Sequence, residues 1–153
     1  MPKVSRYPAR GFHPIGEPPA RRVMTAAAVT IYKGDALHDD TSGYATNATT
    51  AFAATFLGVA AADCASGGQC EYYPPDDKTQ YIVACGDNNA LQQTDVGIVV
   101  DLQECYTIDH NDTITEGVGF FIDEIDISTA ALAAYTDAYG YAIGHFVVKG
   151  AQA

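Results

Sequence analysis

The chain has 153 residues, of which 48% are hydrophobic and only 18% are charged, and its formal net charge is −11. This length and apolar content suffice for one folded domain and exclude an intrinsically disordered chain. The negative charge argues against nucleic acid as the main partner, because phosphate binding needs a clustered basic face. Trp is absent and small residues are frequent, which favours short strands and turns over a thick helical core.

The first 22 residues differ from the rest in charge and in proline content. They contain five basic side chains and one acidic one, a net charge of +4, whereas residues 23–153 have a net charge of −15. Five of the seven prolines also lie there, and proline at this density disfavours helices and central strands. The sequence therefore predicts an extended basic N-terminal arm at residues 1–22 and a β-rich body at residues 23–153.

Anchor-type side chains within this arm predict that it binds a partner. Arginine, aromatic and aliphatic residues are typical of interfaces and unusual in a solubilising tail. The alternative is a disordered tail. The predicted partner-binding residues are Arg6, Tyr7, Arg10, Phe12, His13, Ile15, Arg21 and Arg22.

Neither a secretion leader nor a membrane span is expected. Arg21 and Arg22 precede an apolar run in the manner of a twin-arginine leader, but Thr25 and Thr30 interrupt that run. The longest apolar stretch, residues 51–62, is shorter than the ~20 residues that a membrane helix needs.

Short apolar runs separated by turn residues predict the strands of the body. The runs lie at residues 23–32, 56–60, 81–85, 96–102, 118–127 and 141–149. Turns or loops are predicted between them, at residues 39–44, 63–80, 86–89 and 109–112.

One short helix is predicted near residues 129–139. Ser128 or Asp126 could cap it, alanines fill its interior, and Gly140 would end it. About seven short strands and one helix predict a mainly β fold, either a small β-barrel or a β-sandwich-like body.

Motifs that would indicate catalysis are missing from the sequence. It contains no Gly-x-Ser-x-Gly elbow and no glycine-rich phosphate loop, and its four histidines are scattered. Asp109 and His110 could act as a base beside Cys105, although a polar loop explains them better. We expect a protein that is not an enzyme and that needs no cofactor.

Two acidic groups and four cysteines raise the question of a metal or a disulfide. The acidic residues gather at positions 109–116 and 123–126, but neither group has the spacing of a calcium loop, so a solvated surface is expected. The cysteine spacing does not suit zinc. Unpaired cysteines are expected, with a Cys64–Cys70 bridge as the less favoured alternative.

Five short motifs occur in a characteristic order along the body. They are Ile-Tyr-Lys-Gly-Asp-Ala-Leu at 31–37, Gly-Tyr-Ala at 43–45, Phe-Leu-Gly-Val-Ala at 56–60, Leu-Gln-Gln-Thr-Asp-Val-Gly at 91–97 and Gly-Tyr-Ala-Ile-Gly at 140–144. Together they resemble the capsid decoration (cement) proteins of tailed bacteriophages. The arm and the long cysteine-bearing loop depart from that family's pattern.

The resemblance implies a structural virion protein with a β-barrel-like body that binds the major capsid protein on the outer surface of a phage head. It implies dimers or trimers with further copies, assembly in the bacterial host cytoplasm, and no catalysis. Two alternatives remain. One is another virion component, such as a tail-tube or connector protein. The other is a secreted ligand-binding β domain that uses Tyr135, Tyr139 and Tyr141 to bind a glycan.

Overall fold

A computed structural model describes residues 11–47, 56–76, 78–86, 91–114, 117–126 and 140–149. Within these ranges the chain is almost entirely β, in two sheets with one short 3-10 turn, η2 at Gln93–Asp95, which confirms the predicted fold class. Among the described residues, no helix is long and apolar enough to cross a membrane. The strands are β1 His13–Ile15, β2 Arg22–Thr25, β3 Ala36–Asp39, β4 Ala45–Asn47, β5 Phe56–Ala60, β6 Gln69–Tyr73, β7 Gln80–Cys85, β8 Val99–Glu104, β9 Thr107–Thr113, β10 Gly117–Asp126 and β11 Tyr141–Lys149.

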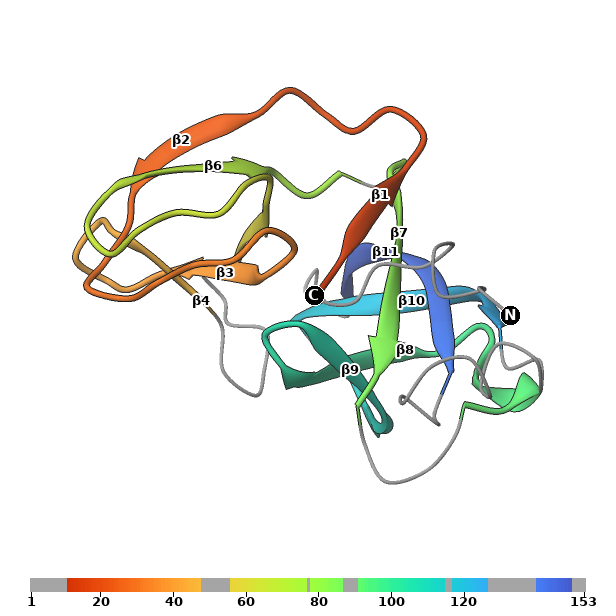
Figure 1. The fold of residues 1–153 in the computed structure, drawn as a ribbon. Helices are drawn as coiled ribbons and strands as arrows, with labels where there is room; N and C mark the ends of the chain where they lie inside the picture. Colours follow the sequence, from red (N-terminus) through yellow and green to blue (C-terminus); the bar gives the residue numbers. More distant parts are fainter. Residues whose placement is uncertain are drawn as a thin grey trace, which may run out of the picture.

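The first sheet closes on itself as a small barrel (Figure 1). Its strands follow the order β7-β11-β10-β8-β9, and β9 returns to β7 in a parallel pairing that joins Ala84 to Thr107 and Cys85 to Ile108. Strand β1 pairs with the first half of β7, beside the part that β9 occupies. Ring closure leaves few unpaired strand edges in this sheet.

The second sheet has the strand order β2-β6-β5-β3-β4 and is curled. Its two outer strands approach each other, because Ala26, directly after β2, forms a parallel bridge with Ala45 of β4. One face encloses a small core, and the other face contributes Ala36 and Val59 to the barrel core. The buried members of the small core are Ala26, Ile31, Leu37, Ala45, Ala60, Cys64, Cys70 and Tyr72.

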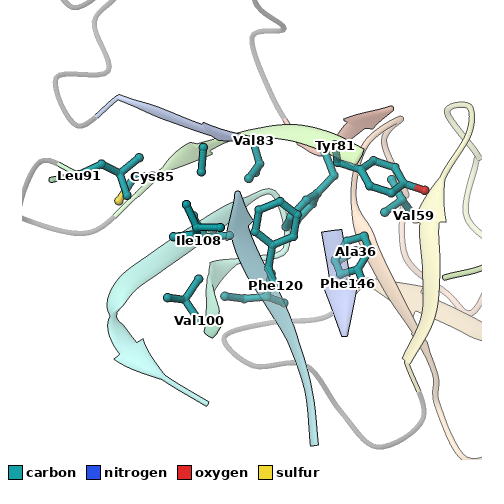
Figure 2. Packing of buried hydrophobic residues seen from close by; sticks show 14 residues of the cluster. Ala36, Val59, Tyr81, Val83, Cys85, Leu91, Val100, Ile108, Phe120 and Phe146 are labelled. Carbon is teal, nitrogen blue, oxygen red and sulfur yellow. The ribbon is translucent and has the colours of Figure 1, made fainter. Parts of the chain in front are cut away.

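Aromatic rings fill the barrel at the end that meets the second sheet (Figure 2). The Phe146 ring lies 5.4 Å from that of Phe120 and 5.2 Å from that of Tyr81, and the Phe12 ring lies 5.3 Å from Phe146. Tilted and edge-on contacts at these separations add to the free energy gained from burial alone. Aliphatic side chains, among them Val83, Val100 and Ile108, complete the core.

Residues 11–15, which the sequence placed in the extended arm, pack against the body. Phe12 is 1% exposed, its amide donates to the Gly34 carbonyl at 2.8 Å, and β1 follows directly. A Cβ atom at Gly11 would lie 2.6 Å from the same carbonyl oxygen, so the two backbones approach closely. The prolines do not prevent strand formation, because β1 has a neighbour on one side only.

Most of the predicted strands are confirmed. Strands β5, β7, β10 and β11 occupy the predicted runs, and the turn at residues 39–44 joins β3 to β4. The run at residues 23–32 forms only the short β2 before the chain turns. The helix predicted at residues 129–139 lies outside the described residues.

Two predicted loops are wrong because each contains a strand. Residues 63–80 include β6, in which Cys70 and Tyr72 are buried while Gln69 and Glu71 are exposed. Residues 109–112 lie inside β9, which pairs with β8 on one side and β7 on the other. Both segments were predicted as loops because they are rich in polar residues. The alternation of buried and exposed residues in β6 nevertheless has the period expected of a strand.

Tyr81 has a buried hydroxyl without a hydrogen-bond partner in the part of the chain that the structure describes. Burial raises the pKa of this phenol well above its ordinary value. The Tyr81→Phe variant should therefore be as stable as the parent or more stable by about 1 kcal/mol, because it removes an uncompensated polar group. A urea unfolding titration measures the change. A loss above about 1 kcal/mol would mean that the hydroxyl is hydrogen-bonded.

Candidate functional site

The segment that links the two sheets forms an exposed strip along the molecule. We define the N-terminal strip as residues 13–23, from β1 on the edge of β7 to β2 on the edge of β6 (Figure 1). Two of the four large apolar side chains exposed among the described residues lie on it, Ile15 at 42% and Val23 at 58%. An apolar side chain exposed beside an incompletely paired strand edge suits contact with another protein surface.

The two arginines of the strip have different environments. Arg21 forms an ion pair with Glu71 at 2.6 Å, and its guanidinium lies 5.6 Å from the centre of the Tyr73 ring. Arg22 is exposed and has no ion-pair partner within the described ranges. Arg21 therefore joins the strip to β6, whereas the exposed Arg22 has its charge available to a partner.

The other predicted partner-binding residues divide into three groups. Phe12 is in the core, so it stabilises the fold and is not exposed for a partner. His13 is half-buried opposite Ile82 of β7, and Ile15 is exposed at the end of the same strand. Arg6, Tyr7 and Arg10 lie outside the described residues.

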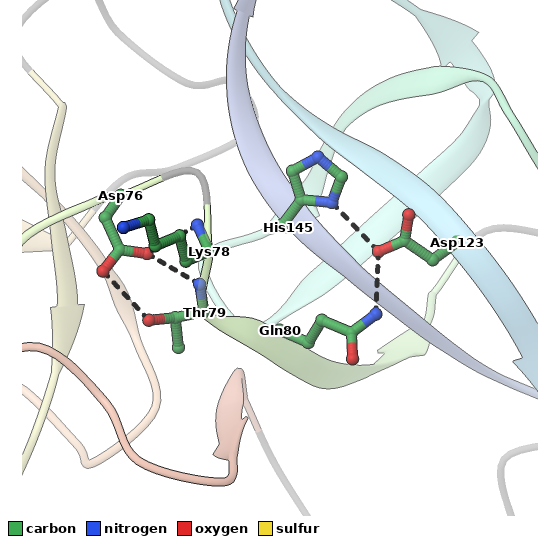
Figure 3. Close-up of polar contacts among 6 residues, drawn as sticks. All are labelled: Asp76, Lys78, Thr79, Gln80, Asp123 and His145. Carbon is green, nitrogen blue, oxygen red and sulfur yellow. Dashed lines mark hydrogen bonds and ion pairs between the residues drawn. The ribbon is translucent and has the colours of Figure 1, made fainter.

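A polar triad that the sequence did not predict lies across three barrel strands (Figure 3). One carboxylate oxygen of Asp123 on β10 is 2.9 Å from Nδ1 of His145 on β11, and it accepts a hydrogen bond from the Gln80 amide of β7 at 3.1 Å. The His145 ring also lies 5.1 Å from the Phe121 ring. The triad spans the β10 bulge between Ile122 and Glu124, where it ties three strands together.

An Asp–His pair is half of the arrangement that activates a nucleophile, so the triad bears on catalysis. In the described part of the chain, no hydroxyl or thiol is hydrogen-bonded to His145. The described contacts of the triad are those of a structural network.

Asp76 orders the turn that leads into β7 (Figure 3). It accepts hydrogen bonds from the Thr79 amide at 2.7 Å, the Thr79 hydroxyl at 3.1 Å and the Lys78 amide at 3.0 Å. Burial opposes ionisation of this carboxyl group, but these hydrogen bonds outweigh it and hold the pKa of Asp76 below its ordinary value. This turn fixes where Gln80 begins β7.

Two of the motifs that resemble phage decoration proteins form turns with a buried carboxylate. Asp35 is fully buried and accepts from the Tyr32 amide at 3.0 Å, beside Gly34 with a φ of 95°. Asp95, 8% exposed, accepts from the Gln92 amide at 2.7 Å in the 3-10 turn before β8. These residues shape the loops at the ends of the strands.

The acidic, cysteine and tyrosine side chains bear on metal binding and glycan binding. The described residues contain no group of three or more His, Cys, Asp or Glu side chains that could hold a metal ion. Tyr141 is only 4% exposed, so it cannot present its ring to a sugar, while Tyr135 and Tyr139 lie outside the described residues.

Comparison with protein-family models and with curated proteins finds no match for this chain. The likeness to phage decoration proteins is therefore carried by the short motifs in the sequence alone.

Proposed function

We propose that this chain is a capsid decoration protein, a structural virion component that binds the outer surface of a phage head and stabilises it. The observation that carries the proposal is the N-terminal strip, which exposes Val23, Ile15 and Arg22 along one continuous segment. The partners in this proposal are the major capsid protein and further copies of the chain, as dimers or trimers.

The distribution of charge supports binding to the capsid through the N-terminal side of the protein. Residues 1–22 have a net charge of +4 on a body with a net charge of −15, so the N-terminal side is attracted to an acidic surface while the rest stays solvated. Each Å² of apolar surface that the strip buries on the capsid contributes roughly 25 cal/mol to the binding free energy, before the cost of ordering is subtracted. Many copies on one shell add these modest contributions together, as multivalent binding requires.

The strip predicts which substitutions weaken binding. The double variant Arg22→Glu/Val23→Ala should bind undecorated shells about tenfold more weakly, because it reverses an exposed positive charge and removes the most exposed apolar side chain of the strip. Both positions are exposed, so the fold should lose no more than about 0.5 kcal/mol per site. Co-sedimentation titrations measure the affinity.

A matched control uses an exposed aromatic residue outside the strip. Tyr44 is 45% exposed in the turn between β3 and β4, and Tyr44→Ala should leave binding unchanged. Equal losses for the control and the double variant would exclude the strip as the docking surface.

A further inference from the structure

Two cysteines lie next to each other in the core of the second sheet. Cys64 follows β5 and pairs through its backbone with Ile31, and Cys70 is the second residue of β6. Both side chains belong to the same buried cluster, in which Cys70 is fully buried and Cys64 is 7% exposed. Only residues 65–69, the loop before β6 and its first residue, separate them in sequence.

That loop folds back and keeps the two cysteines in the same buried cluster. The Gly68 amide donates to the Ala65 carbonyl at 2.9 Å, which closes a tight turn. The Cys64 sulfur packs against Gly68, 3.6 Å from the position that a Cβ atom would take there, and Cys64 lies near enough to Cys70 to help raise the pKa of its thiol. A disulfide between them would close a short loop inside one buried cluster.

We propose that Cys64 and Cys70 are a modification site, which a peroxide converts from a dithiol to a disulfide. Cys64 is the more exposed thiol, so its sulfur attacks the peroxide oxygen, which gives a sulfenic acid and one water. The Cys70 sulfur then displaces the hydroxyl group, which leaves with the Cys70 proton as a second water. Two thiols and one hydrogen peroxide thus become one disulfide and two waters.

The environment of Cys70 limits the rate at which its sulfur attacks the sulfenic acid. Burial, together with the neighbouring Cys64, raises the pKa of Cys70 to about 12, so few molecules hold it as the thiolate at neutral pH. The disulfide should therefore form slowly at pH 7 and faster as the pH rises toward this value.

The bond would fasten the loop after β5 to β6. In a reducing cytoplasm the thiols remain, and outside the cell the disulfide persists. This timing rests on the proposed function, because it assumes that the protein assembles in a cell and is then released on a virion. The chemistry itself does not depend on a capsid.

The test treats the purified full-length chain with equimolar hydrogen peroxide, then measures intact mass, free thiols after denaturation, and cross-linked peptides. We expect a mass loss of two hydrogen atoms, two remaining thiols of the original four, and a Cys64–Cys70 peptide. The Tm should rise by about 5 °C. The Cys64→Ala variant should show none of these changes. If Cys64→Ala folds poorly, the Cys64→Ser variant replaces it in the test.

Cys105 provides the matched control, because it is 8% exposed, close to the value for Cys64. The Cys105→Ala variant should still form the Cys64–Cys70 bond. Four free thiols after treatment, stable oxygen addition at Cys64, or a link to another cysteine would overturn the proposal. None of these outcomes bears on capsid binding, so the two proposals can fail separately.

Discussion

Replacing Phe12 with alanine is expected to remove about 3–5 kcal/mol from the free energy of unfolding. The ring is 1% exposed and lies 5.4 Å from that of Phe120 and 5.3 Å from that of Phe146, so its loss leaves a cavity in the barrel core. A domain of this kind has a total stability of roughly 5–15 kcal/mol, so the variant should be close to unfolding. Urea titration measures the loss as a lower midpoint.

Ile15 provides the control within the same segment. It is 42% exposed, and the Ile15→Ala variant should change stability by no more than about 0.5 kcal/mol. If Phe12→Ala were as mild as Ile15→Ala, the segment before β2 would be a separate arm, as the proline content first indicated. A large difference between the two variants would place Phe12 in the fold and leave Ile15 for a partner.

A second large effect is expected at Gly144, where β11 lies against β10. A Cβ atom there would be 1.9 Å from the Phe121 carbonyl oxygen and 2.8 Å from the Phe120 ring. Backbone cannot move aside cheaply in a closed barrel, so Gly144→Ala should cost about 3 kcal/mol or more. Thermal and urea unfolding measure the cost, and near-ultraviolet circular dichroism reports whether the aromatic core remains packed.

Gly43 separates steric overlap from the general effect of adding a methyl group. It lies in the turn between β3 and β4 with nothing within 4 Å of an added Cβ, although its φ is +89°. The Gly43→Ala variant should cost only about 1 kcal/mol, from backbone strain. Similar costs at the two glycines would contradict the close approach of β10 and β11.

The strands that the sequence predicted correctly are those with a clear apolar pattern. In β11, Ala142 and Phe146 face the core while Ile143 and His145 are half-buried. Such alternation predicts a strand from the sequence alone. Strand β9 was missed because its partners support it where its own composition does not. Ile108 is its only large apolar residue that is fully buried, and pairing with β8 and β7 holds the rest.

Long-range contacts explain why the candidate site could be predicted only in part. The sequence marks the N-terminal segment as unusual, but Phe12 and Ile15 look equally suited to an interface until their burial is known. Gln80, Asp123 and His145 come together from three strands that are far apart in the chain. No local motif encodes such a triad, and neither does the parallel pairing that closes the barrel.

Binding to shells tests the central claim most directly. Purified full-length protein is titrated onto undecorated phage-head shells, and the bound protein is measured by co-sedimentation. The capsid decoration proposal predicts saturable binding at a fixed number of copies per shell, and affinity that falls as salt rises. Absence of binding to intact shells at low salt, with the protein folded, would contradict it.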